Sequence, residues 1–327
     1  MLRPFSAKGP GISIALSAQD ARTIPQPLLD SILAQERLPD EFVICVDELG
    51  PMGREKLQNF QDRAGFPVHI HRNGNKLGQA GSTLKALSLC KREVIVGADC
   101  WDLWLPDKLQ TIEQAFLESP KTALILFNAT LADGAGESLG GTVWEEALFD
   151  RQARYRFARD PLAAVLKHHI CRVPCMAFRA DHLRWILPVP LGWNVEGWIG
   201  LMLCALQPVT LMARPLSLRR LDGRPQPLRF REPFSKIDGM TQRWERRLHC
   251  WELAVDRLEC LSPRGLESQS ADKIRDFIQH YQFRASLPDA VLVRLKAMIP
   301  EFLAGRYHRF SYGWQCLFRD MFLLDPA

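Results

Sequence analysis

A chain of 327 residues, 47% hydrophobic and 24% charged, is long enough to bury the core of one large domain or two ordinary ones. Its net charge of +5 is mild, and its basic residues are dispersed without a nucleic-acid-binding motif, so we expect no nucleic-acid partner. Nine cysteines without a CxxC pair favour reduced thiols, which argues against a disulfide-based secreted scaffold.

Apolar runs and helical patterns then alternate along the first 131 residues. The run beginning at Ile12 and ending at Leu16 reads as a buried strand, and "IPQPLLDSILAQ" follows it with a helical pattern. Further strands are predicted by "EFVICVDE", "FPVHIHRN", "REVIVGAD" and "KTALILFNATL", and further helices by residues 78–90 and by "PDKLQTIEQAFLES". Continuous apolar strands that alternate with helices are typical of an α/β fold with a parallel sheet covered on both faces.

The pattern changes after about Leu131. "PCMAFRADHLRWILP" predicts a strand and a short helix, and "NVEGWIGLMLCAL" predicts an apolar helix that carries Glu196 near its start. "QPVTLMARPLSLRRLDG" reads as two extended segments, and the chain beyond Pro233 reads as amphipathic, Arg-rich helices. The segment "MLRPFSAKGPG" lacks the apolar core of a signal peptide, and Gln207 and Pro208 interrupt the most apolar run. We therefore expect a cytoplasmic protein that does not cross a membrane, with peripheral contact at the inner face left open.

Polar side chains gather where three of these strands end. They are Ser17 and Asp20 after the first strand, Asp47 and Glu48 after the second, and Asp99 and Asp102 after the fourth. Ligands of parallel sheets collect at the carboxyl ends of the strands, so these residues predict a binding site.

The pair Asp99 and Asp102 has two readings. Two carboxylates at a strand end can hold a hard cation against a phosphate. Alternatively, Asp102 or Asp107 caps the helix that follows. The residues alone leave both open for Asp102, whereas the position of Asp99 between strand and loop favours a functional role.

The ordered motifs resemble family-2 glycosyltransferases with the GT-A fold, in particular bacterial enzymes whose acidic motif runs "DQDDIWLPNKL". "DCWDLWLPDKL" is similar to that motif, "ISIALSAQD" to the family's first strand, and "LLDSILAQERLPDEFVICVDE" to its second strand and preceding helix. "NKLGQAGSTLKAL" resembles "NxGxxxNxxxAL", "LPVPLGWNVEGWIGLML" the segment that carries the catalytic acid, and "RPLSLRRLDG" the motif "EPLILYRQHG".

The resemblance implies a Rossmann-like, mostly parallel central sheet with helices on both faces, followed by a C-terminal helical region. It implies a GT-A domain over residues 1–232, with a nucleotide-binding half at 1–131 and an acceptor-binding half at 132–232, and an amphipathic helical region at 233–327. The implied activity is inverting transfer of a sugar from a UDP- or dTDP-linked donor to a glycan or lipid-linked acceptor in bacterial cell-surface polysaccharide synthesis.

The resemblance also implies roles for single residues. Glu196 would be the general base, and Asp99 and Asp102 would bind Mg²⁺ or Mn²⁺. Trp193 and Trp198 would stack on the acceptor. The implied nucleotide-binding residues are Ser17, Asp20, Asp47, Glu48, Gly78, Ser82, Lys85 and Asp99.

Three departures and several plainer readings stand beside these roles. Trp101 replaces the middle carboxylate of the acidic motif, Leu221 and Asp222 stand where the family often has Gln and His, and "CVDELG" replaces "VDDGS". A catalytically impaired protein that binds nucleotide sugar or glycan is therefore the alternative. Both tryptophans could be core aromatics, Glu196 could be a helix N-terminal acid, and the arginines at 219, 220 and 224 read as a solvated basic edge or a phosphate clamp.

Overall fold

The computed structural model describes residues 9–221, 240–261 and 266–322. The first part of the chain alternates strands and helices, as expected. Its elements are β1 (Ile12–Asp20), η1 (Ala21–Thr23), α1 (Gln26–Leu33), β2 (Glu41–Glu48), α2 (Pro51–Arg63), β3 (Val68–Arg72), α3 (Gly78–Leu89) and β4 (Val94–Ala98). The strands β1, β2 and β4 are buried along nearly their whole length, which explains why their sequences are apolar runs rather than alternating patterns.

The middle of the chain adds five strands and several short helices. They are β5 (Asp102–Trp104), α4 (Lys108–Glu118), β6 (Leu124–Ala132), β7 (Ser138–Thr142), α5 (Val143–Glu146), α6 (Arg151–Phe157), α7 (Pro161–Lys167), η2 (Val173–Cys175), β8 (Met176–Arg179), η3 (Ala180–His182), α8 (Leu183–Ile186), α9 (Val195–Leu206) and β9 (Val209–Arg220). The two extended segments predicted at the end of this region are one strand, β9. Its pairing with β6 shifts register twice, so the strand bends without breaking.

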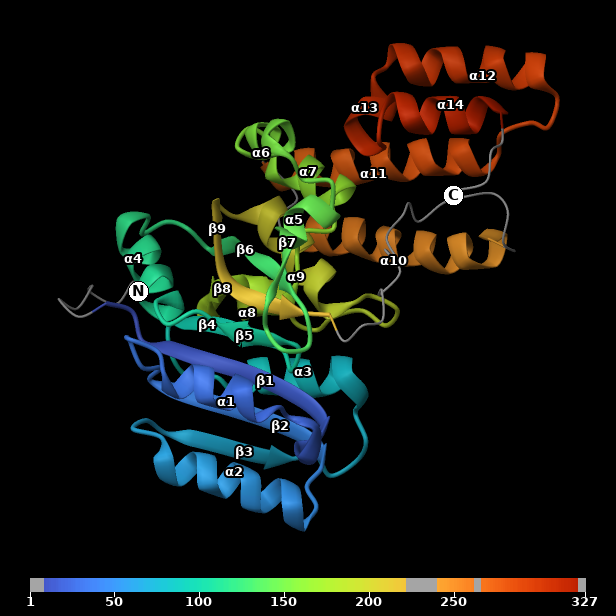
Figure 1. The fold of residues 1–327 in the computed structure, drawn as a ribbon. Coiled ribbons are helices and arrows are strands. Elements are labelled where there is room, and N and C mark those ends of the chain that lie inside the picture. The colour runs from blue at the N-terminus through green and yellow to red at the C-terminus, as the bar shows by residue number, and fades with distance from the viewer. Residues whose placement is uncertain (1–8, 222–239, 262–265, 323–327) are drawn as a thin grey trace.

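The described residues form one nine-stranded sheet of order β3-β2-β1-β4-β8-β6-β9-β5, with β7 paired to β6 (Figure 1). The pairs β3-β2, β2-β1, β1-β4 and β6-β9 are parallel, and β8 enters the sheet antiparallel to both neighbours. The carboxyl ends of β1, β2 and β4 therefore lie along one edge, which brings their polar termini together.

Helices cover both faces of this sheet, as predicted. On one face, α1, α2 and α4 bury apolar side chains such as Leu28, Phe60 and Ile112 against the strands. On the other face, α3, α7 and α9 build a second core, which includes Trp198 and Leu203. The fold class predicted from the sequence is confirmed.

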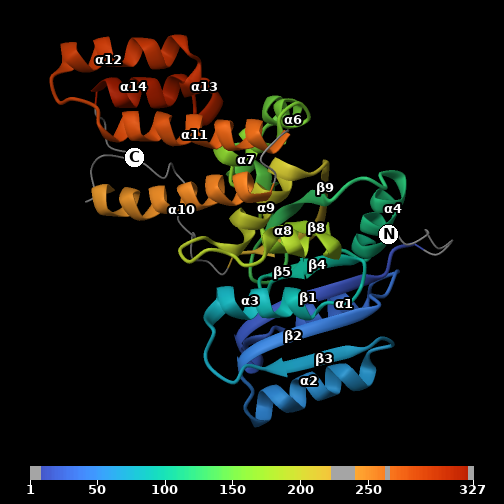
Figure 2. The same ribbon diagram turned by 180° about the vertical axis from the view of Figure 1, so that it is seen from behind.

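The C-terminal region is helical, as predicted: α10 (Met240–Leu261), α11 (Leu266–Ala285), α12 (Val291–Leu303), α13 (Arg306–Phe310) and α14 (Trp314–Phe322). Side chains of α10 and α11, including Leu258 and Ile274, belong to the same apolar cluster as α9. The helices α12, α13 and α14 lie farther out, at the end of the molecule opposite to β3 and α2 (Figures 1 and 2). Within the described ranges, no helix has the length and apolar character needed to cross a bilayer.

Candidate active site

Asp47, at the end of β2, organises the loop that leads into α3. Its Oδ1 accepts hydrogen bonds from Asn73 Nδ2 at 2.7 Å, the Leu77 N–H at 3.0 Å and Ser82 Oγ at 3.1 Å, and its Oδ2 accepts one from the Gly78 N–H at 3.0 Å. The bond from Asn73, opposed by burial and supported by the other donors, holds the pKa of this carboxyl below its usual value. Only Oδ2 keeps capacity for a ligand, so Asp47 is first of all a structural anchor.

Three other predicted nucleotide ligands are turned inward, which corrects the expectation for their side chains or N–H groups. Ser17 Oγ lies 2.7 Å from Thr83 Oγ1, Ser82 bonds Asp47, and the Gly78 N–H is committed to Asp47. Lys85 is half-buried near Cys45 and His71, and its role in nucleotide binding stays a prediction. Burial raises the pKa of Cys45 to about 11 although Lys85 opposes the shift, and burial followed by the charge of Lys85 lowers the pKa of His71. The sequence predicted Ser17 after the first strand, whereas β1 extends to Asp20 and includes it. It placed Gly78, Ser82 and Lys85 correctly on α3 but did not show which face they occupy.

Asp20 and Glu48 do meet at the edge of the sheet, because they are partners in the parallel register of β1 and β2. Asp20 accepts the Arg22 N–H at 2.8 Å and so caps η1, while exposed Glu48 pairs with Lys76 at 2.6 Å. A pocket of about 420 Å³ opens here. Its lining residues are Asp47, Glu48, Leu49, Gly50, Arg72, Asn73, Gly74, Asn75 and Lys76. Acceptors and two cationic side chains, Arg72 and Lys76, therefore surround a hollow at the predicted binding edge.

The acidic loop after β4 is held by β9, a strand that comes much later in the chain and contacts the loop through Arg219 and Arg220. Asp99 Oδ1 accepts the Trp101 N–H at 2.9 Å, and the Asp102 N–H donates to the Asp99 carbonyl at 3.2 Å, which makes a tight turn. Asp102 then opens β5 and faces Arg219 of β9 in the antiparallel register. Asp102 therefore caps no helix, and the capping alternative is wrong for this residue.

Arg219 links both carboxylates of the acidic loop. Its Nη1 lies 3.4 Å from Asp102 Oδ1 and 3.7 Å from Asp99 Oδ1. Asp102 is fully buried and its Oδ2 has no hydrogen-bond partner, so burial raises its pKa to about 6 although Arg219 opposes the shift. The guanidinium keeps a raised pKa beside these acids despite its burial.

These residues do not fit the divalent ion expected between Asp99 and Asp102. Mg²⁺ and Mn²⁺ need several oxygen ligands around one open point. Trp101 offers none, Asp102 is closed off from solvent, and Arg219 already pairs with both acids. A cation 4 Å from that guanidinium would be repelled by about 4 kcal/mol per unit of charge. Within the described ranges, no group of three acidic, His or Cys side chains could hold a metal, and Asp222 lies outside those ranges. The metal assignment of Asp99 and Asp102 is corrected accordingly.

Glu196 lies on the same side as the acidic loop. It sits in the first turn of α9, which Asn194 caps by accepting the Gly197 N–H at 2.7 Å. Its Oε2 accepts the Val173 N–H at 3.1 Å. Burial raises the pKa of Glu196, the charge of Asp99 raises it further, and Val173, Arg172 and Arg219 oppose the shift. Asp99 and Arg219 therefore lie near enough to Glu196 for their charges to act on its carboxyl.

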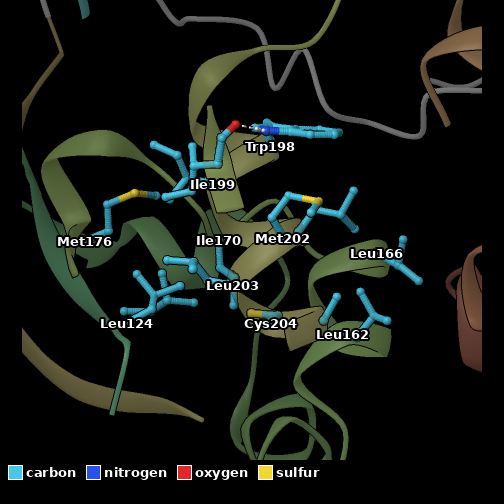
Figure 3. Close-up of a cluster of buried hydrophobic side chains, with 14 of the residues drawn as sticks. Leu124, Leu162, Leu166, Ile170, Met176, Trp198, Ile199, Met202, Leu203 and Cys204 are labelled. Carbon is cyan, nitrogen blue, oxygen red and sulfur yellow. Dashed lines mark hydrogen bonds between the residues drawn. The ribbon is translucent and has the colours of Figure 1, made fainter. Parts of the chain in front are cut away.

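The two tryptophans near Glu196 differ from expectation. Trp198 is 0% exposed, and its Nε1 donates to the Ile186 carbonyl at 2.7 Å within the core around α9 (Figure 3). The expectation that Trp198 stacks on an acceptor is wrong, because neither face of the indole is open. Trp193 is half-buried, packs edge-on against Trp251 and donates from Nε1 to the Cys250 carbonyl at 2.8 Å. Only Trp193 remains a candidate for acceptor contact.

Sequence reasoning underestimated the basic residues of the site. Arg219 was read as a solvated basic edge or a phosphate clamp, although it is only 11% exposed. Its neighbour Arg220 donates from Nη2 to the Cys100 carbonyl at 3.1 Å and so ties the acidic loop to β9. Arg224 lies outside the described residues. Lys108 was missed: it is fully buried, stacks over Trp104 and donates to the Pro174 carbonyl. Ser217 and Arg219 are two positions apart on β9 and so share one face of the strand, on which Ser217 is fully buried.

Residues 23–184 match the family described as "Glycosyl transferase family 2". A protein of Nostoc sp. strain PCC 7120, named uncharacterized glycosyltransferase alr2836, is 22% identical over 219 residues. The match covers 65% of this chain and 65% of the relative, so the chain spans just under two thirds of the relative's length.

Solved structures show the same architecture. TarS of S. aureus in complex with UDP-GlcNAc has a TM-score of 0.57 at 12% identity, over 88% of this chain and 79% of the TarS chain. The TarS complex with UDP has a TM-score of 0.55 at 13% identity, over 84% and 72%. At such identities the likeness concerns the fold. The chain therefore has a GT-A fold, and residues 23–184 match the glycosyltransferase family 2 domain.

Proposed function

We propose that this protein transfers a sugar from a nucleoside-diphosphate donor to an acceptor hydroxyl with inversion at the anomeric carbon. The observation that carries the proposal is the position of Glu196. The carboxyl of Glu196 is half-buried, burial raises its pKa, and it lies near enough to Asp99 and Arg219, beside the carboxyl edge of a parallel sheet, for their charges to act on it. That edge is where such sheets bind ligands, and a desolvated acid beside it is suited to accept a proton near neutral pH.

The proposed sugar transfer is a single displacement at the anomeric carbon. The acceptor oxygen forms a bond to the anomeric carbon as the bond from that carbon to the donor phosphate breaks, and the nucleoside diphosphate leaves with the bonding electrons. The acceptor proton passes to Glu196, whose Oε2 is held by Val173 and whose Oε1 is left for the acceptor. The Val173 N–H fixes the direction of the carboxyl, which is the main structural requirement of a general base.

The donor would lie across the ends of β1, β2 and β4. The pocket beside Asp47, Glu48 and Asn73 suits a base and ribose, which need hydrogen-bond acceptors and donors. Asp20 and Asp99 follow along the same edge, at the ends of β1 and β4. A UDP- or dTDP-linked sugar is proposed, and UDP-GlcNAc is a natural first probe because TarS, which shares the fold, has been solved with it. Residues 1–131 would then be the nucleotide-binding half.

The acceptor would approach from residues 132–232, on the side of Glu196 and Trp193. A glycan or lipid-linked acceptor of bacterial cell-surface polysaccharide synthesis is proposed. The support is the similarity of "DCWDLWLPDKL" to the acidic motif of that bacterial subgroup.

A peripheral position at the inner face of the membrane is proposed from the C-terminal region, residues 233–327. Leu292, Ile299 and Leu303 of α12 share one helical face and are 75%, 55% and 77% exposed. On neighbouring α14, Trp314 and Phe318 are exposed at a spacing of four, and Trp314 packs against Phe302 of α12. Such a face can lie on a lipid surface. Cosedimentation with anionic vesicles should be weakened by Leu292→Ser/Leu303→Ser, and binding that this change leaves intact would contradict the proposal.

The catalytic proposal is tested with a panel of UDP- and dTDP-sugars. Binding is followed by calorimetry and turnover by release of the free nucleotide. At least one donor should bind and turn over, and Glu196→Gln should retain binding while losing about 10²- to 10⁴-fold in turnover. Glu118→Gln, an exposed acid of α4, is the matched control and should behave as the unchanged protein. Turnover that survives Glu196→Gln would contradict the assignment of the base.

The second candidate is a catalytically impaired protein that binds nucleotide sugar or glycan. Trp101, 42% exposed between the two acids, favours it because an indole replaces a carboxylate at the centre of the motif. Binding of a donor without release of its nucleotide, in the presence of glycan acceptors, would favour this candidate over the enzyme.

A further inference from the structure

Arg219 stands where the acidic loop could otherwise accept a cation. It lies on β9 directly across from Asp102 of β5, and its Nη1 is within 4 Å of both Asp102 and Asp99. Its side chain is only 11% exposed, and its ion pair with the fully buried Asp102 fixes its position. The guanidinium is therefore a built part of the site rather than a surface charge.

The residues next to Arg219 also favour an arginine over a divalent ion at the acidic loop. Arg220, next along β9, donates from its N–H to the Trp101 carbonyl at 2.9 Å and from Nη2 to the Cys100 carbonyl at 3.1 Å. The acidic loop is thus held by the strand that carries Arg219. Trp101 removes the middle carboxylate of the loop, and that loss would leave a divalent ion short of ligands but does not affect an arginine.

We propose that the Arg219 guanidinium, and not a divalent ion, binds the diphosphate of the donor, so that donor binding and sugar transfer proceed without Mg²⁺ or Mn²⁺. This inference rests on the proposed transferase function and specifies how its leaving group is stabilised.

The chemistry of the side chain supports the assignment. A guanidinium has five N–H donors in a planar fork, and the hydrogen bond to Asp102 uses Nη1. The remaining donors match the spacing of phosphate oxygens, to which arginine binds through two parallel hydrogen bonds. As the bond from the sugar to the phosphate breaks, the charge that develops on the leaving oxygen is met by this fixed cation. No proton needs to move to or from Arg219.

Arg219 is not the only cation that balances the charge of Asp99 and Asp102. Buried Lys108 helps Arg219 to balance the negative charge of Asp102. Arg172 adds positive charge near Glu196, and Arg220 adds positive charge near the Cys100 carbonyl. The local balance therefore leaves cationic capacity for a diphosphate.

The test compares UDP and dTDP binding by calorimetry in excess EDTA and in Mn²⁺, with nucleotide release from the sugar donors measured in the same two buffers. The inference predicts dissociation constants and rates that agree within about twofold. Binding that is lost in EDTA and restored by Mn²⁺ would overturn it while leaving the transferase function intact. A chain that binds neither nucleotide in either buffer would contradict the transferase function itself, and the inference with it.

Variants locate the effect on Arg219. Arg219→Gln should weaken UDP binding at least tenfold in EDTA, the loss of a charge-assisted contact. Because this change leaves Asp102 buried without its partner, Asp102→Asn/Arg219→Gln is made in parallel to remove both charges together. Arg214→Gln, on the same strand but in an exposed pair with Asp107, is the matched control and should bind as before. Unchanged UDP affinity in a folded double variant would overturn the inference.

Discussion

The backbone N–H of Val173 donates a hydrogen bond of 3.1 Å to Glu196 Oε2 and thereby fixes the carboxyl proposed as the general base. Val173 in turn is positioned by its contact with β4. A Cβ atom at Gly97 would lie 2.2 Å from the Val173 carbonyl oxygen, so the close approach of η2 to the sheet depends on a glycine at this position.

Gly97→Ala should therefore displace Val173 and release Glu196. We expect turnover to fall at least tenfold and the free energy of unfolding to fall by about 1–3 kcal/mol, the usual cost of overpacking. Steady-state kinetics and urea unfolding measure the two effects. Gly134→Ala, where an added methyl group meets open space, is the control. Full activity in Gly97→Ala would show that Val173 does not orient the base.

Asp47 and Glu48 are adjacent acids that should respond very differently to substitution. Asp47→Ala removes the acceptor of four hydrogen bonds and should cost about 2–4 kcal/mol of unfolding free energy, with weaker donor binding because the loop before α3 loses its anchor. Glu48→Ala breaks only an exposed pair with Lys76 and should cost less than about 1 kcal/mol. Equal losses in urea unfolding would contradict the anchoring role.

Trp198→Phe should lower stability and leave acceptor recognition unchanged. The substitution removes the hydrogen bond to the Ile186 carbonyl and opens a small cavity, for a loss of about 1–3 kcal/mol. Trp193→Phe, in the half-buried neighbour, is the comparison. The acceptor KM, once an acceptor is known, should rise for Trp193→Phe alone. A KM that rises for Trp198→Phe as well, at undiminished stability, would restore Trp198 to the site.

Stability should depend on pH through His168, which is buried and lies 3.2 Å through Nδ1 from the Ala147 carbonyl. Burial lowers its pKa to about 4. Between pH 6.5 and pH 4, His168 therefore binds a proton in the unfolded chain but stays neutral in the folded chain. The free energy of unfolding falls as the pH drops through this range, by about 2 kcal/mol at pH 5.

His168→Leu removes this contribution, so urea unfolding at pH 7 and pH 5 should differ less in the variant than in the unchanged protein. His249→Leu, in an exposed histidine of α10, is the control. The other buried histidines remain in all three proteins and cancel in the comparison. An identical pH dependence with and without His168 would contradict its burial in the neutral form.

The sequence predicted the parallel half of the sheet because buried parallel strands are continuous apolar runs. The four strands β1, β2, β4 and β6 were all found from such runs. The three-residue strand β5 was missed because "DLW" carries no period of its own, and β9 was divided in two because its apolar pattern is interrupted at Arg214 and Pro215. Short and bent strands are defined by their neighbours rather than by their own sequence.

The site was predicted in position but not in orientation. Strand ends located Asp20, Glu48 and Asp99, since carboxyl termini of parallel strands share an edge. The side-chain partners could not be read in the same way. Arg219 meets Asp102 because β5 and β9 pair antiparallel in a register that places the two residues opposite each other, although they are 117 positions apart in the chain. Whether Ser17 faces a ligand or α3 likewise depends on packing.

The pH dependence of kcat/KM for nucleotide release tests the central claim most directly, measured in the unchanged protein and in Glu196→Gln. Because burial raises the pKa of Glu196 above its ordinary value of 4.5, and the base acts only when deprotonated, the rate should fall on the acidic side with a midpoint above pH 4.5. Glu196→Gln should lose about 10²- to 10⁴-fold in rate together with this acidic limb. A variant that keeps both its rate and the same acidic limb would show that Glu196 is not the base.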